Sequence, residues 1–169
     1  TECVPLDALQ GAASRVIAET TGAEAGIVTS GAAAGLMLGA AAILTGFDLA
    51  RMEKLPHTED FPHEFVVARE HRNGYDHAVR AAGVRFVEVG FHEIVAGAGV
   101  RRAEAWEYAA AFGPRTAGVL FVYDTIPGQG VPAVFAEVVR LAHARGLPVL
   151  VDAAGELPPR SNLRDIIAA

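Results

Sequence analysis

Apolar residues recur at helical spacing near the start of the chain and predict a first helix. Pro5 suits the first turn of a helix, and Gly22 suits its end, because glycine readily adopts the left-handed conformation that closes a helix. The apolar positions of this helix are Leu6, Leu9, Ala13, Val16 and Ile17.

Strand-like and helix-like segments then alternate along the chain. Five runs rich in apolar and β-branched residues predict strands, and the segments between them carry helical spacing or form loops, such as the charged loop at 51–63. This alternation predicts one α/β domain with three αβα layers and a mainly parallel sheet. The strands are predicted at Gly26–Ser30, Phe65–Ala68, Arg85–Val89, Ala117–Tyr123 and Pro148–Asp152, and the later helices at 32–47, Tyr75–Ala82, Ala103–Ala111 and 134–142.

The segment from Gly26 to Phe47 has 22 residues without a charge and contains Gly31, Gly35 and Gly39 at intervals of four. A membrane helix is one interpretation of this pattern. Its first residues favour a strand and a turn, however, and the remaining helix of about 16 residues would span only about 24 Å of a hydrocarbon core about 30 Å thick. We therefore expect a helix buried against the sheet, and no membrane partner.

Charge and cysteine content indicate which partners and which cellular compartment to expect. Lys and Arg total 14 against 20 Asp and Glu, and the net charge of −6 argues against nucleic acid as a partner. Cys3 is the only cysteine, so the chain has no internal disulfide and we expect a cytoplasmic protein. Of the basic residues 13 are Arg, and Lys54 is the only lysine.

The two ends of the chain favour a piece of a longer polypeptide. The chain begins at Thr1 without a methionine or a leader pattern, and it ends on the apolar stretch Ile166–Ala169. With 51% apolar residues, its 169 residues still suffice for one compact core.

Ligands of parallel α/β sheets gather where strands turn into helices, so these turns are the first places to seek chemistry. The first turn, Thr29–Gly35, offers a hydroxyl, glycines and the start of a helix, which together could hold a phosphate. Taken alone, Ser30 is more simply a helix cap. The segment is not a Walker loop, and the chain has no G-x-G-x-x-G motif.

The second turn, Val151–Glu156, places Asp152 at the end of an apolar strand. A carboxylate is costly to bury there without a cation or several hydrogen bonds, so the protonated nitrogen of a ligand is one candidate partner. The alternative is that Asp152 caps the following helix.

The third turn, Arg69–His77, follows the predicted strand that ends at Ala68 and contains His71. This histidine could stack on a ligand or serve only the structure. We interpret the six scattered histidines as surface residues, and their spacing does not favour a metal site. No Gly-x-Ser-x-Gly elbow supports hydrolysis by a serine nucleophile.

Together these turns resemble a known family. The matching segments are Thr20–Ala25, Val28–Ala34, His71–Arg80 and Val151–Pro159. They resemble the pyridoxal-phosphate (PLP) enzymes of the selenocysteine-synthase-like group, within the fold-type I aminotransferase superfamily. This group includes the selenium transferases that act on seryl-tRNA and ammonia lyases of the D-glucosaminate-6-phosphate type.

The resemblance implies a role for each matching residue. Ser30, Gly31 and Ala32 would hold the cofactor phosphate, and His71 would stack on the pyridine ring. Asp152 would pair with the ring nitrogen and keep it protonated, so that the ring accepts electrons from a substrate carbanion. Ala154 would pack on the other ring face. The contact to the ring hydroxyl stays unassigned, because the corresponding stretch here is Asp124–Gly128.

The resemblance also implies that residues 1–169 are the central part of the PLP-binding large domain. The Schiff-base lysine of the group follows the Asp strand, whereas Lys54 lies in the loop before the predicted strand at Phe65–Ala68. We therefore expect that the chain holds neither this lysine nor the small C-terminal domain and is inactive alone.

For the whole enzyme we expect β-elimination or ammonia-lyase chemistry on a small amino acid or amino-sugar acid, in a homo-oligomer. The alternatives are selenium transfer onto seryl-tRNA and a non-catalytic phosphate-binding or scaffold domain.

Overall fold

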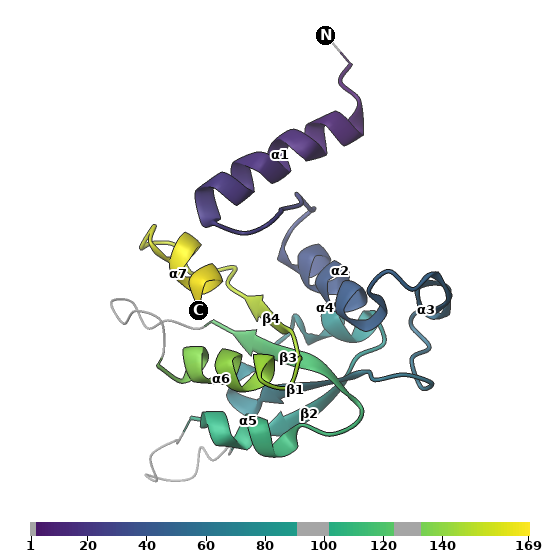
Figure 1. Cartoon of the computed structure of the whole chain (residues 1–169), viewed down its shortest axis with the longest axis vertical. Coiled ribbons are helices and arrows are strands. Elements are labelled where there is room, and N and C mark those ends of the chain that lie inside the picture. Colours follow the sequence, from purple (N-terminus) through teal and green to yellow (C-terminus); the bar gives the residue numbers. More distant parts are fainter. Residues whose placement is uncertain (1–2, 91–101, 124–132) are drawn as a thin grey trace.

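A computed structural model of the chain describes residues 3–90, 102–123 and 133–169. These residues form an α/β fold in which helices and strands alternate (Figure 1). The helices are α1 (Leu6–Thr21), α2 (Ala32–Thr45), α3 (Leu49–Lys54), α4 (Asp76–Ala81), α5 (Ala105–Ala111), α6 (Ala133–His143) and α7 (Asn162–Ala168), with a 3-10 turn η1 (Arg69–His71); the strands are β1 (Glu64–Ala68), β2 (Arg85–Val89), β3 (Thr116–Val122) and β4 (Val149–Asp152).

The four strands form one parallel sheet in the order β2-β1-β3-β4. Every residue of β1 is buried, because this strand lies inside the sheet and has a packed layer on each face. Parallel strands covered on both faces are expected to be apolar throughout, which explains the run Phe65–Ala68. The predicted α/β class and parallel sheet are confirmed.

Successive residues of the central strands point to opposite faces and build two separate cores. On one face, Val66 and Phe121 pack with residues of α5 and α6 such as Tyr108 and Phe135. On the other face, Phe65 packs with residues of α2 and α4. The three predicted layers are therefore present, with α5 and α6 on one side of the sheet and α2 and α4 on the other.

The first helix matches its prediction. Helix α1 ends at Thr21, and Gly22 adopts a left-handed φ of 84° while its N–H donates to the Ala18 carbonyl. This is the helix-closing geometry that glycine favours. Helix α1 has no buried residue, and its contacts include a set with α7, which lies close to its C-terminal end in Figure 1.

The predicted strand at Gly26–Ser30 is wrong. Ile27 and Val28 are 64% and 57% exposed, and the backbone N–H and carbonyl of Val28 bond the side chain of Gln10. None of the described strands lies beside this segment. The β-branched residues favour an extended chain, but a strand needs a neighbour to form a ladder.

The interpretation of 51–63 as a loop is wrong in its first part, where α3 extends to Lys54. Asp48 caps this helix, because its carboxylate accepts hydrogen bonds from the N–H groups of Ala50 and Arg51. Helix α7 was not predicted either. None of the helices in the described ranges is both long and apolar enough to cross a membrane.

Gly83 closes the turn between α4 and β2, and a substitution at this glycine tests how tightly the turn packs. Its φ is +100°, and a Cβ there would lie 2.3 Å from the Pro56 carbonyl oxygen. We expect Gly83→Ala to lower the free energy of unfolding in urea by about 2 kcal/mol or more, because it combines backbone strain with a clash. Gly113→Ala, where a Cβ meets nothing within 4 Å, should change it by less than about 0.5 kcal/mol. Equal losses in both variants would contradict this packing.

Candidate functional site

The carboxyl ends of β1, β3 and β4 meet at one edge of the sheet, and Asp152 lies there at the end of β4. Asp152 pairs with Val122 of β3, and its backbone carbonyl accepts a hydrogen bond from the N–H of Tyr123 at 2.8 Å. Its carboxylate accepts one from the N–H of Ala154 at 3.2 Å. The next described helix begins ten residues later, at Asn162, so the alternative that Asp152 caps a helix is wrong.

The start of α2 offers backbone N–H groups that no side chain caps. Gly31, with φ of 139°, is the N-cap residue, so Ser30 is not the cap that its sequence position suggested. The helix begins one residue later than that interpretation requires. Ser30, Gly31 and Ala32 are all exposed, and a Cβ on Gly31 would meet nothing within 4 Å. An anion could therefore approach these N–H groups closely.

One open cavity of about 230 Å³ brings the first and second turns together. The carboxylate-bearing end of β4 forms one wall, and the first two turns of α2 form the other. Of the predicted site residues, Ala32, Asp152 and Ala154 line this cavity, whereas Ser30 and Gly31 lie next to it in the chain. The lining residues are Ala32, Gly35, Leu36, Leu150, Val151, Asp152, Ala153 and Ala154.

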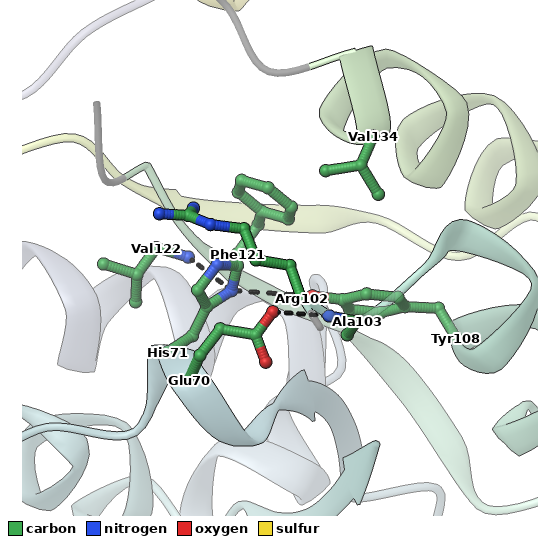
Figure 2. A pocket seen from close by; sticks show the side chains of 8 residues that line it. All are labelled: Glu70, His71, Arg102, Ala103, Tyr108, Phe121, Val122 and Val134. Carbon is green, nitrogen blue, oxygen red and sulfur yellow. Dashed lines mark hydrogen bonds between the residues drawn. The ribbon is translucent and has the colours of Figure 1, made fainter. Parts of the chain in front are cut away.

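His71 lies elsewhere, in a small cavity of about 10 Å³ on the face that carries α5 and α6 (Figure 2). Its side chain is 7% exposed and meets the Phe121 ring edge-on, with 4.6 Å between ring centroids. Its Nδ1 lies 3.5 Å from both the Tyr108 hydroxyl and the N–H of Val122. Because that N–H can only donate, Nδ1 is the acceptor in the contact with Val122.

The interpretation of the histidines as surface residues is wrong for two of them. His71 and His63 are both buried, and Nδ1 of His63 lies 2.8 Å from the Phe61 carbonyl, which fixes its ring. The exposed histidines are His57, His77 and His143, and His92 falls outside the described residues. Within the described ranges, no group of three or more His, Cys, Asp or Glu is placed to hold a metal ion.

Sequence reasoning missed two neighbours of His71. Glu70 accepts a hydrogen bond from the N–H of Ala103 at 2.6 Å, and its other carboxylate oxygen is buried with no hydrogen-bond partner among the described residues. Tyr108 comes from α5 and is 1% exposed. The charge of Glu70, two residues after the apolar strand β1, was a usable signal, whereas nothing local marks Tyr108.

Burial raises the pKa of the Tyr108 hydroxyl far above its ordinary value, and the nearby Glu70 carboxylate adds to this increase. The pKa of Tyr123 is raised as well, first by burial and then by the carboxylates of Glu156 and Asp165. Both phenols therefore stay neutral at physiological pH and can donate a hydrogen bond.

Comparison with known proteins shows clear relatives, although no family model matches the chain. The chain is 34% identical over 161 residues to a Streptomyces 5'-C-glycyluridine monooxygenase-decarboxylase, covering 90% of this chain and 38% of that protein. It is 32% identical over 157 residues to the D-glucosaminate-6-phosphate ammonia lyase of Salmonella typhimurium, covering 90% of this chain and 40% of that protein. The chain thus spans about two fifths of the length of these relatives.

Comparison with solved structures also finds an ammonia lyase among the similar proteins. A D-glucosaminate-6-phosphate ammonia-lyase structure aligns with a TM-score of 0.82 and 31% identity, over 99% of this chain and 43% of that one. The N-succinyldiaminopimelate aminotransferase of Mycobacterium tuberculosis shares the fold, with a TM-score of 0.55 and 21% identity over 86% of this chain and 35% of that one.

The chain has the fold of its structural neighbours, which are aminotransferase-like enzymes of PLP fold-type I. In sequence it is homologous to a segment of D-glucosaminate-6-phosphate ammonia lyase. The resemblance found in the sequence is thereby confirmed, whereas the roles of individual residues stay predictions.

The buried Tyr108 hydroxyl predicts how stability depends on pH. Above about pH 10 an unfolded tyrosine ionises while Tyr108 in the folded chain stays protonated, so stability falls as pH rises, by up to about 1.4 kcal/mol per pH unit. Tyr108→Phe removes this one ionising group. Between pH 9 and 11 the free energy of unfolding in urea should therefore fall less steeply with pH in Tyr108→Phe than in the wild type. Tyr75→Phe, at a side chain 57% exposed, serves as control. An identical decline in wild type and Tyr108→Phe would contradict the raised pKa.

Proposed function

We propose that this chain is the central part of the PLP-binding domain of a lyase that removes ammonia from an amino-sugar acid. The observation that carries the proposal is the single cavity shared by the start of α2 and Asp152. A relative named as an ammonia lyase supports the reaction. The other relative is named for decarboxylation, so release of carbon dioxide in place of ammonia is the competing outcome.

The residues at the start of α2 fit the phosphate of PLP. Helix α2 begins with uncapped N–H groups and an exposed Ser30 hydroxyl, and Gly31 leaves open space beside them. Backbone N–H groups at the positive end of a helix dipole favour a bound anion. Ser30, Gly31 and Ala32 would therefore hold the cofactor phosphate through donated hydrogen bonds.

Asp152 fits the pyridine nitrogen. Its backbone is held by β3, and one carboxylate oxygen is engaged by the Ala154 N–H, so the carboxylate is oriented before a ligand arrives. A carboxylate beside the ring nitrogen would keep that nitrogen protonated. When bound, the cofactor would supply an electron sink for the substrate. The Asp152 carboxylate would hold the proton on the ring nitrogen, and Ala154 would pack against one face of the ring.

The family resemblance implies that His71 stacks on the opposite face of the ring, although His71 is buried in a different cavity from that of Asp152 in this structure. It follows β1, which lies on the other side of β3 from β4, so β3 separates it from Asp152 along the same edge. Its ring orientation is fixed by Val122 and Phe121. We propose this role because the matching segment of the family implies it and because the imidazole is held in a fixed orientation.

We propose that the lysine that binds the cofactor lies outside these 169 residues, together with the small domain. Lys54, the only lysine, pairs with Asp60 at 2.6 Å and does not line the cavity that holds Asp152. Without that lysine the chain alone would be inactive.

The parent enzyme is further proposed to be a cytoplasmic homo-oligomer. Apolar side chains remain exposed on α1, including Leu6, Leu9 and Val16 at 57% or more, and such surface is expected to be covered in an assembly. A single cysteine, Cys3, suits a reducing compartment.

Asp152→Asn in the full-length protein tests the proposed site. We expect ammonia release from D-glucosaminate 6-phosphate to fall on the order of a hundredfold or more, because the neutral amide no longer holds the proton on the ring nitrogen. Urea unfolding should show a folded protein. Asp7→Asn on exposed α1 is the matched control and should retain activity. Full activity of Asp152→Asn, or a loss of stability without loss of activity, would favour a scaffold role.

Borohydride reduction of the full-length protein with PLP, followed by peptide mapping, tests the position of the lysine. The expected adduct lies on a lysine outside residues 1–169. No adduct is expected on Lys54, because its ammonium group pairs with Asp60 away from the cavity. A stable adduct on Lys54 would contradict the proposal.

A further inference from the structure

Two side chains of α1 hold the segment Gly26–Val28, which leads into the start of α2. Figure 1 shows the chain turning back beneath α1 on its way to α2. The side-chain amide of Gln10 forms two hydrogen bonds with Val28: its N–H donates to the Val28 carbonyl, and its oxygen accepts from the Val28 N–H, each at 3.3 Å. The Ser14 hydroxyl oxygen accepts a hydrogen bond from the Gly26 N–H at 3.0 Å. Because residues four apart lie on one face of a helix, Gln10 and Ser14 bind the segment together.

Gly26 lies so close to α1 that the structure leaves no room for a side chain there. A Cβ on Gly26 would lie 2.5 Å from Cγ2 and 2.6 Å from Cβ of Ile17. The Cβ of Ile17 is attached directly to the helix backbone and cannot rotate away. A larger residue at position 26 would therefore displace the segment from α1.

The contacts with α1 take the place of a strand ladder. None of the described strands lies beside Gly26–Ser30. The side chains of Ile27 and Val28 are 64% and 57% exposed, so deep burial does not fix the segment either. Backbone groups that would pair with a neighbouring strand in a sheet bond to side chains of α1 instead.

Thr29 connects the held segment to the first turn of α2. Its hydroxyl donates to the Gly31 carbonyl at 2.9 Å, and the same carbonyl accepts the N–H of Gly35 at 3.1 Å. In a trans peptide the carbonyl and the next N–H point in opposite directions. With the Gly31 carbonyl directed into α2, the Ala32 N–H is directed away from the helix. A phosphate bound at the start of α2 would lie on that side.

We propose that Gln10 and Ser14 are positioning residues for the cofactor phosphate. They fix the segment Gly26–Val28 and thereby the N–H groups at Ser30–Ala32, so that these donors are oriented before the phosphate binds. Neither side chain lines the cavity of Asp152, so both act through the backbone that they hold. This inference rests on the proposed function, because it requires the phosphate of PLP to bind at the start of α2.

The test compares PLP with pyridoxal, which lacks the phosphate, in absorbance titrations of the full-length protein freed of its cofactor. The readout is the dissociation constant of pyridoxal divided by that of PLP. In Gln10→Ala/Ser14→Ala this ratio should fall tenfold to roughly a hundredfold, because only PLP uses the displaced N–H groups. A variant that is merely less stable would bind both compounds more weakly and keep the ratio. An unchanged ratio overturns the proposal.

Thr20→Ala is the matched control, because it removes an uncharged polar side chain from the last turn of the same helix. It should keep the wild-type ratio. A fall in Thr20→Ala as large as that in Gln10→Ala/Ser14→Ala would show that any truncation on α1 has this effect, and would overturn the specific role of Gln10 and Ser14.

Hydrogen exchange separates this inference from the proposed function. In the full-length protein without cofactor, the amides of residues 26–32 should exchange at least about tenfold faster in Gln10→Ala/Ser14→Ala than in the wild type, while those of β1 and β3 keep their rates. Equal exchange of residues 26–32 in both proteins overturns the inference. If the wild type binds pyridoxal as tightly as PLP, the proposed phosphate site fails, whereas faster exchange in the variant still supports the anchoring by Gln10 and Ser14.

Discussion

The parallel pairing of β1, β3 and β4 determines where the candidate functional residues lie. Val66 of β1 pairs with Val119 of β3, and Val122 of β3 pairs with Asp152 at the end of β4. Because β1 is buried on both faces, a slip of one residue would exchange the two cores, so this register is strongly specified. The register aligns the strand ends and thereby places the Asp152 carboxylate beside the start of α2.

Much of this arrangement could be predicted from the sequence. Four of the five predicted strands form, because continuous apolar runs such as Ala117–Tyr123 are suited to a sheet covered on both faces. Asp152 stood out because a charge directly after such a run needs a partner. Two of the turns that carry the family resemblance, Arg69–His77 and Val151–Glu156, lie at the ends of β1 and β4, where α/β enzymes bind their ligands.

The remainder depends on contacts between distant residues. Gly26–Ser30 has the composition of a strand, yet Val28 bonds the Gln10 side chain and no described strand lies beside it. His71 resembles a surface residue in its polar segment, but Tyr108 and Phe121 enclose it from elements far along the chain. Local composition does not predict contacts with residues that are distant in the sequence.

The central claim is that one cavity holds the cofactor, with its phosphate at the start of α2 and its ring nitrogen at Asp152. A crystal structure of the full-length protein with PLP tests it most directly. The account predicts phosphate oxygens within about 3 Å of the Ser30–Ala32 N–H groups and the ring nitrogen within about 3 Å of an Asp152 carboxylate oxygen. A cofactor bound with its phosphate elsewhere, or with its ring nitrogen away from Asp152, would contradict it.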